Sequence, residues 1–188
     1  MKTNKISRRT FAAGALASTG MLAACGNGVG SRGGSLIDSR VDVTLEEMYR
    51  SYPNTVQLSQ KANGMLVMPL VTEAGLGFGG AYGRGALRVN DATVDYYSVV
   101  KGSGGLQIGA QQFAHVLFFM TEEALTGFRR SPGWAAGADL EYVVSDQGDS
   151  VAADTTTALS PVLAAVFARA GLRIGATLEG TKYTRIIP

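Results

Sequence analysis

The sequence predicts an α+β domain with a strongly curved, mainly antiparallel β-sheet or partial barrel, N-terminal helices and one short helix near residues 121–130. Three observations predict this fold. Strand-like stretches dominate after residue 64, and most of their connections are tight, which favours antiparallel pairing. Glycine accounts for 25 of the 188 residues, and glycine inside strands permits sharp bends and the close approach of another element. Helical periodicity is confined to short stretches, most of them before residue 64.

Two helices are expected before the strands begin. Thr44-Leu45-Glu46-Glu47 has the pattern of a capping box, in which Thr44 caps a helix and Glu47 returns a hydrogen bond from the third position. Pro53 suits the first position of a second helix. That helix is expected to run to about Ala62, because Asn63-Gly64 is a typical C-terminal stop.

The middle of the chain is expected to be mostly strands. Residues 65–71 form an uninterrupted apolar run, which predicts a strand buried on both faces. Asn90-Asp91 has the residue types of a hairpin turn. The further strands are predicted at residues 75–83, 84–89, 93–100 and 106–119, with a glycine-rich loop at 101–105.

The last third of the chain adds one helix and the remaining strands, for about seven strands in all. Thr121 is expected to cap the short helix, with acidic side chains in its first turn and basic ones in its last. Residues 134–145 alternate between apolar and polar side chains over most of their length, so they predict the clearest amphipathic strand. A polar loop is expected at 146–153, and the last strands at 155–169, 172–178 and 182–187.

The N-terminus has the order of an export signal. Basic residues come first, and a mild apolar stretch over residues 11–24 follows, too short for the roughly 20 residues of a membrane-spanning helix. Leu22-Ala23-Ala24-Cys25 resembles a lipobox, which is cut just before an acylated cysteine. Arg8 and Arg9 lie in a stretch that resembles a twin-arginine motif. We therefore expect residues 1–24 to be a signal peptide and Cys25 to carry fatty acids such as palmitate.

This reading divides the chain into three parts. Residues 25–40 are expected to be a lipidated flexible tether, because residues 26–35 are rich in glycine and serine. Residues 41–188 then form the folded domain. Cys25 is the only cysteine, so lipidation leaves no thiol for a disulfide, a metal site or a nucleophile. The expected location is the periplasmic side of the cell envelope. The absence of Asp directly after Cys25 favours the outer membrane over the inner.

Charge gives no reason to expect a nucleic-acid partner. The chain has 17 basic and 15 acidic residues. The expected signal peptide contains four of the basic residues and none of the acidic ones, which leaves 13 against 15 and a net charge of −2. No basic run remains that would bind nucleic acid.

Residue types that form catalytic, cofactor or metal sites in other proteins do not form a convincing site of this kind here. Gly75-x-Gly77-x-x-Gly80 matches a dinucleotide fingerprint, but the further glycines that follow prevent the helix which that fingerprint needs. His115 is the only histidine, so no zinc site is expected. Gln107, Gln111 and His115 share one face of a predicted strand, where they form either a polar patch lining a cavity or part of the structural core.

Acidic residues are no more specific. Asp139 and Glu141 share a strand face that is expected to be solvated, and Asp146, Asp149 and Asp154 match no calcium loop. No enzyme activity is expected. The basic residues that are candidates for contacts with lipid headgroups are Lys61, Arg84, Arg88, Lys101, Arg129 and Arg130.

Several stretches together resemble the SYLF domain family, also called Ysc84 or DUF500. They are MLVMPLVTEAGLGFGGAYGRGALRV at 65–89, YYSVVKGSGGLQIGAQQFAHVLFFMTEEAL at 96–125, Gly133-Trp134, and the ending TKYTRIIP. The resemblance covers roughly residues 40–188. It implies a lipid-binding domain, since eukaryotic relatives bind phosphoinositides and some bind and bundle actin. Bacterial members resemble envelope lipoproteins.

One segment departs from the eukaryotic pattern. Those relatives have a basic amphipathic N-terminal segment that contributes to membrane binding. Here residues 41–62 hold two basic residues, Arg50 and Lys61, against three acidic ones. This composition removes the electrostatic attraction to anionic lipid. The actin role is not carried over, because an exported bacterial protein meets no host-type actin filament in its own envelope. What the resemblance implies is affinity for membrane lipids or acyl chains.

The leading hypothesis is a membrane-tethered envelope lipoprotein with a non-enzymatic lipid-binding domain. The alternative is a structural or protein-interaction lipoprotein without a specific lipid ligand. A third reading, an enzyme acting on envelope lipid, would depend on His115.

Overall fold

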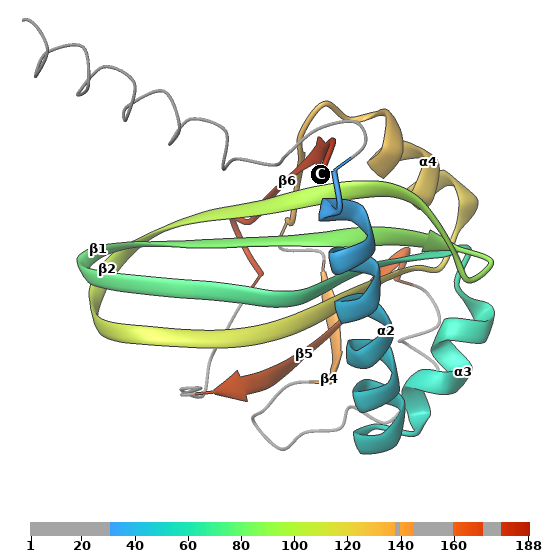
Figure 1. Ribbon diagram of the computed structural model, residues 1–188, viewed down its shortest axis with the longest axis horizontal. Helices are drawn as coiled ribbons and strands as arrows, with labels where there is room; N and C mark the ends of the chain where they lie inside the picture. Colours follow the sequence, from blue (N-terminus) through green and yellow to red (C-terminus); the bar gives the residue numbers. More distant parts are fainter. Residues whose placement is uncertain (1–30, 138–139, 145–159, 171–177) are drawn as a thin grey trace, which may run out of the picture.

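The computed structural model of the chain describes residues 31–137, 140–144, 160–170 and 178–188. Within these ranges, three helices and six strands follow in the order α2–α3–β1–β2–α4–β3–β4–β5–β6 (Figure 1). The strands form one sheet, in which every pair is antiparallel except β4 with β5. The predicted α+β class, with a strongly curved and mainly antiparallel sheet, is confirmed.

One very long hairpin dominates the sheet. Strand β1 (Gly64–Val89) pairs with β2 (Ala92–Phe119) over its whole length, from Gly64 opposite Phe119 to Val89 opposite Ala92. Asn90 and Asp91 connect them with positive φ angles of 50° and 63°, as a tight hairpin turn requires. The predicted turn is confirmed. Both strands bend sharply near their middles, so that the hairpin doubles back on itself (Figure 1).

The glycine-rich loop predicted at residues 101–105 is wrong, because these residues are part of β2. They pair with the equally glycine-rich middle of β1; Gly102, for example, lies opposite Gly80. Glycine on both strands permits the bend without interrupting the ladder of backbone hydrogen bonds. The predicted break between the strands at 75–83 and 84–89 is absent for the same reason.

The remaining strands attach to opposite halves of β2. Strand β5 (Val162–Ala170) pairs with residues 112–119, and β6 (Lys182–Ile186) pairs with residues 96–100. At the outer edges, β3 (Trp134–Ala135) joins β6 and β4 (Glu141–Val144) joins β5. The single strand predicted over 134–145 is therefore wrong, since its two ends lie at opposite edges of the sheet. The predicted loop at 146–153 and nearly all of the strand predicted at 172–178 lie outside the described residues.

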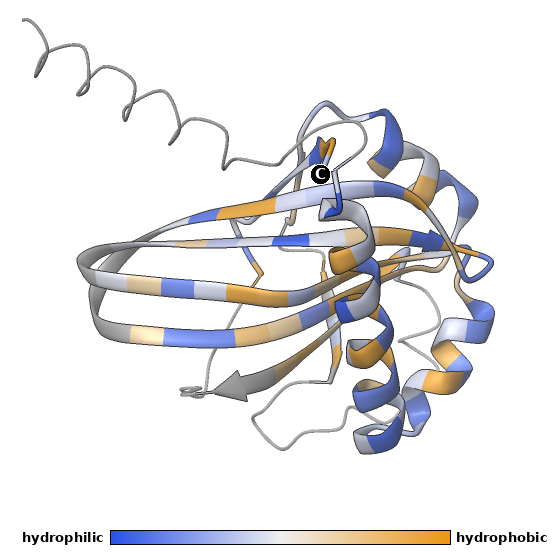
Figure 2. Cartoon of the chain, viewed as in Figure 1, coloured by the Kyte–Doolittle hydropathy of each residue, from blue (hydrophilic) through white to orange (hydrophobic). Residues whose placement is uncertain are grey.

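The first helix begins earlier than expected. Helix α2 (Gly33–Ser51) contains Thr44 in its interior, where the side chain is fully buried. The predicted capping box is therefore wrong, and residues 33–40 of the predicted tether are helical. Apolar spacing explains the early start, because Ile37, Val41 and Met48 recur on the buried side of one continuous helix. Figure 2 shows hydrophobic positions recurring along α2 between hydrophilic ones.

The other two helices agree with their predictions. Helix α3 (Asn54–Lys61) follows Pro53 and ends close to the predicted Asn63-Gly64 stop. Helix α4 (Glu122–Arg130) is capped by Thr121, whose hydroxyl oxygen accepts a hydrogen bond from the Ala124 backbone N–H at 3.2 Å. A proline start and an Asn-Gly stop predicted α3, whereas a side-chain cap and charged ends predicted α4.

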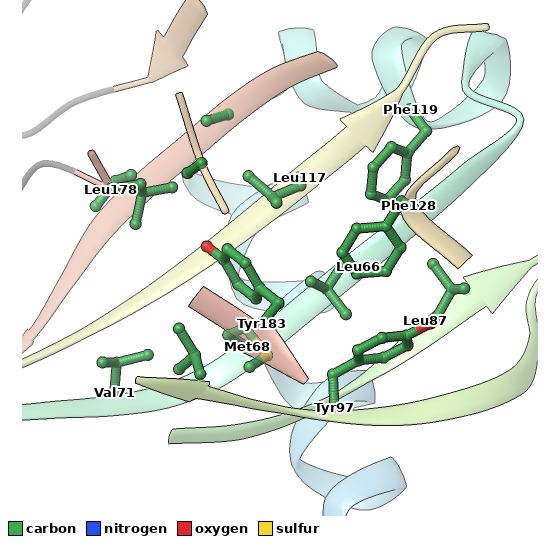
Figure 3. Packing of buried hydrophobic residues seen from close by; sticks show 14 of the residues in the cluster. Leu66, Met68, Val71, Leu87, Tyr97, Leu117, Phe119, Phe128, Leu178 and Tyr183 are labelled. Atoms are coloured by element: carbon green, nitrogen blue, oxygen red, sulfur yellow. The ribbon is translucent and has the colours of Figure 1, made fainter. Parts of the chain in front are cut away.

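Each face of the sheet carries its own core layer. Side chains of α2, such as Val41 and Met48, pack on one face against Val67, Val116 and Phe167. The other face packs against α4 and against the curled-over β6, through a cluster whose large members include Leu66, Leu117, Phe128 and Tyr183 (Figure 3). Alternate residues of β1 and β2 therefore serve the two layers in turn, as the two-residue period of a strand requires.

Two glycines allow the folded hairpin to close. A β-carbon on Gly83 would lie 2.6 Å from the Leu70 carbonyl oxygen, and one on Gly85 would lie 2.0 Å from the Val67 carbonyl oxygen. The second half of β1 thus rests directly on the backbone of the first half. The dinucleotide motif at Gly75 lies within the same strand, which continues to Val89, so no helix directly follows the motif. The expectation that these glycines serve close packing is confirmed at Gly83 and Gly85.

Candidate functional site

An open apolar groove runs between α2 and the first half of β1. Its volume is about 540 Å³, within the range of small-molecule sites. The groove is lined by Leu36, Ser39, Arg40, Val43, Pro69, Leu70 and Gln112. Leu36 and Val43 are 60% and 56% exposed. Two large apolar side chains of one helix therefore meet solvent beside an apolar strand, although the helix has a separate buried face.

An irregularity in β1 forms the strand side of the groove. The register between β1 and β2 shifts between Met68 and Val71, so Pro69 and Leu70 fall at a bulge. Proline has no backbone N–H to donate to the ladder, which makes a bulge a suitable place for it. Leu70 is only half-buried, although residues 64–69 before it and Val71 after it are buried, because the bulge directs it to the groove.

A smaller hollow of about 240 Å³ continues the groove toward the start of α2. The two share Leu36, Arg40 and Leu70. The smaller one is more polar, since Thr72, Tyr82 and Arg84 also line it. The combined site therefore has an apolar body and a polar, cationic end.

The charges around this cationic end favour an anion. Among the described residues, Arg40 makes no ion pair. The nearby acids of α2 are engaged elsewhere: Asp42 pairs with Arg88, and Asp38 accepts hydrogen bonds from the Thr93 and Tyr96 hydroxyls at 2.7 and 2.8 Å. Burial and the bond to Asp38 raise the pKa of Tyr96, so its hydroxyl stays protonated as the donor. The same bonds fix α2 against the end of the hairpin.

The six basic residues predicted to contact lipid are dispersed over the fold. Arg84 lines the smaller hollow, while Arg88 is paired with Asp42 and Arg129 with Asp95. The other three lie on different elements, at the end of α3, on β2 and at the end of α4: Lys61, Lys101 and Arg130. Because α2 and α4 cover opposite faces of the sheet, these six side chains do not surround one site.

Sequence reasoning missed the α2 side of the groove. Leu36, Arg40 and Val43 follow one another at helical spacing on the outer face of α2. The spacing is present in the sequence, but the glycine- and serine-rich residues 26–35 predict a flexible tether up to residue 40. That prediction hides the start of α2 and therefore its outer face.

His115 lies in the core instead of a cleft. It is fully buried, its Nε2 lies 2.8 Å from the Tyr183 hydroxyl oxygen, and burial lowers the pKa of His115 from 6.5 to about 3. His115 is therefore neutral and enclosed, as a structural role requires. Gln111 donates to the Glu73 carboxylate at 2.7 Å, and both of these side chains are also buried. The side chain of Gln107 lies outside the described residues.

Several other sequence candidates also lie outside the described residues. These are Arg8, Arg9, Leu22, Ala23, Ala24, Cys25, Asp139, Asp146, Asp149 and Asp154. Within the described ranges, no group of three or more His, Cys, Asp or Glu side chains is placed to hold a metal ion. Helices long and apolar enough to cross a membrane are also absent from that part of the chain.

Comparison with known proteins identifies the family. No curated protein matches the chain. Residues 100–185 match the family model Ysc84, described as "Las17-binding protein actin regulator". The matched segment begins in β2 and ends in β6, so it contains α4 and strands β3–β5 between them. The resemblance found in the sequence is thereby confirmed over residues 100–185, which carry the Ysc84 (SYLF) family match.

Proposed function

We propose that the chain is a membrane-tethered lipoprotein of the cell envelope, anchored by Cys25 on the periplasmic side, whose Ysc84 domain binds lipid without turning it over. The observation that carries this proposal is the apolar groove between α2 and β1. Its exposed Leu36 and Val43 would be removed from water by a bound acyl chain. Burying such side chains is favourable by about 25 cal/mol per Å² of apolar surface.

The polar end of the groove suits the head of the same ligand. Arg40 lines both the apolar groove and the smaller hollow, so it lies where the two environments meet. An acyl chain in the groove would place a carboxylate or phosphate near this guanidinium. Arginine is well suited to such groups because its donors form a planar fork.

A fatty-acid binding assay tests the apolar part of the proposal. The chain from residue 26 retains every described residue, and its affinity for a fluorescent fatty acid can be measured by titration. Val43→Glu places a charge in the groove and should weaken binding at least about tenfold, which corresponds to about 1.4 kcal/mol. Val94→Glu is the matched control, because Val94 is also exposed but lines neither hollow. If no protein binds the probe, or if both variants bind as the wild type does, this site is wrong.

A second comparison tests the polar end. Arg40→Gln should weaken the binding of a long-chain fatty acid but leave that of the fatty alcohol of equal length unchanged, since only the acid carries a charge at neutral pH. Equal effects on the two ligands would mean that Arg40 does not contact the headgroup. Failure of all lipids to bind would favour the alternative, a structural or protein-interaction lipoprotein.

A further inference from the structure

The groove is continued on the surface by a strip of exposed apolar side chains, which begins at Leu36 in the groove and extends beyond the part that a ligand in the groove would cover. Tyr82 and Val100 are 55% and 52% exposed and lie opposite each other on β1 and β2. Tyr82 also lines the smaller hollow together with Leu36. The strip therefore runs from α2 across both strands of the hairpin. Contiguous exposed apolar surface of this kind marks an interaction site.

All of these side chains lie on one face of the molecule. Tyr82 and Ala86 are four residues apart in a regular stretch of β1, so they share a face. Ala86 belongs to the core layer beneath α2, which places Tyr82 and its partner Val100 on the α2 side. Ala81 and Val99 point to the opposite core layer. The strip and the mouth of the groove thus open in the same direction.

The chemistry of this face fits a lipid surface. Tyrosine is enriched where membranes meet water because its ring is apolar and its hydroxyl is polar. Arg40 and Arg84 flank the apolar strip, and the neighbouring acids of α2, Asp38 and Asp42, are held in hydrogen bonds and an ion pair. A cationic rim around apolar side chains suits the phosphates and the acyl boundary of a bilayer.

The start of α2 lies beside the smaller hollow and only a short length of chain after the expected anchor, Cys25. Gly33, the first residue of α2, lines the smaller hollow. Cys25 precedes it by eight residues, which span at most about 29 Å when fully extended. A lipid on Cys25 would therefore hold this end of α2, and the groove beside it, within reach of the bilayer. Helix α4 lies on the other face of the sheet.

From these relationships we infer that the domain lies on the bilayer through the strip Leu36, Tyr82 and Val100, so that the groove opens into the leaflet. A lipid then enters the groove from the membrane without passing through water. This inference rests on the proposed function, because it takes the anchor and the groove as given. It adds the orientation of the domain and the route of its ligand.

Quenching by brominated lipid tests the orientation. Trp134 is the only tryptophan, so Trp134→Phe provides a background in which one new tryptophan reports its own position. The reporter is Tyr82→Trp, and the control is Glu123→Trp on the exposed side of α4. The lipidated full chain of each variant is reconstituted into vesicles of phosphatidylcholine and phosphatidylglycerol, with or without bromine on the acyl chains. Circular dichroism verifies that each variant is folded.

We expect the bromine to quench the tryptophan at position 82 at least twofold more than the tryptophan at position 123. Equal quenching at the two positions, stronger quenching at 123, or no quenching at either would overturn the inference. The fatty-acid titration in solution separates this failure from failure of the proposed function, because it needs neither the anchor nor a bilayer. If the groove binds fatty acid but position 82 is not quenched, only the orientation is wrong.

Discussion

Gly85 lies directly against the backbone of Val67: a β-carbon on Gly85 would be 2.0 Å from the Val67 carbonyl oxygen and 2.3 Å from the Met68 sulfur. Both residues belong to β1, so this contact joins the two halves of one strand after it has doubled back. A methionine side chain can move aside, but a carbonyl oxygen in a strand cannot. The curvature of the sheet therefore depends on the absence of a side chain at this position.

Gly85→Ala is expected to lower the free energy of unfolding by about 3 kcal/mol or more, because overpacking against backbone leaves little room for relaxation. Urea denaturation followed by circular dichroism measures this loss. Gly102→Ala is the control, since a β-carbon there would meet nothing within 4 Å and should change stability by less than about 1 kcal/mol. Similar losses in the two variants would contradict the proposed role of Gly85.

Asp38 is expected to stabilise the position of α2 on the sheet. Asp38→Ala removes the acceptor for the Thr93 and Tyr96 hydroxyls, and bonds to a charged group contribute roughly 1.5–3 kcal/mol each. Because these bonds are only partly buried, we expect a combined loss of about 2 kcal/mol in thermal or urea unfolding. Glu46→Ala, on an exposed position of the same helix, should stay within about 0.5 kcal/mol of the wild type. Equal effects would show that Asp38 does not anchor the helix.

The buried His115 is expected to make the fold sensitive to acid. Its pKa is about 3 in the folded state against 6.5 for an exposed histidine, so the unfolded chain binds the proton more readily. Stability is therefore unaffected by this group above pH 6.5 and falls as the pH drops from 6.5 toward 3. Urea midpoints measured at pH 7 and pH 5 should show this fall. His115→Gln, which retains a polar partner for Tyr183, should reduce the difference between the two midpoints. An unchanged difference would assign the acid sensitivity to carboxylates.

Cys25→Ser is expected to abolish lipidation and the cleavage that follows it. The variant should appear as an unprocessed or soluble protein when membrane and soluble fractions are compared by immunoblotting. Arg8→Lys with Arg9→Lys is a separate variant, which should impair export only if the twin-arginine route is used. Membrane fractionation identical to that of the wild type after Cys25→Ser would count against the anchor.

Short sequence patterns predicted the turns and helix ends that are stabilised by residues close together in the sequence. The Asn90-Asp91 turn and the Thr121 cap both depend on residues within a few positions of each other, and both were placed correctly. Thr44 shows the limit of this reasoning. Its capping pattern is present, but the apolar spacing from Ile37 to Met48 continues through it, and burial against the sheet favours one continuous helix.

Long-range geometry explains what the sequence did not predict. The alternation over residues 134–145 is compatible with one strand, and only the pairing of Trp134 with Tyr183 and of Glu141 with Leu163 separates it into two. The groove was missed for a similar reason. Leu36 and Val43 become a site only when the bulge at Pro69 lies beside them, and no local pattern indicates that residues so far apart in the sequence are neighbours.

The segment that the family model matches is shorter than the segment that has to fold as one unit, because the match begins inside the β1–β2 hairpin. The family match begins at Val100, partway along β2, whereas β2 is paired with β1 along its full length and supplies Tyr97 and Val99 to the core before that point. A fragment starting at residue 100 would keep β5 but lose all of β1 and, except for Val100, the residues of β2 that pair with β6. Its remaining strand would present an unpaired edge, which promotes aggregation. The cooperative folding unit therefore begins well upstream of the matched segment, and excising the domain at the boundary of the match would cut through its longest hairpin.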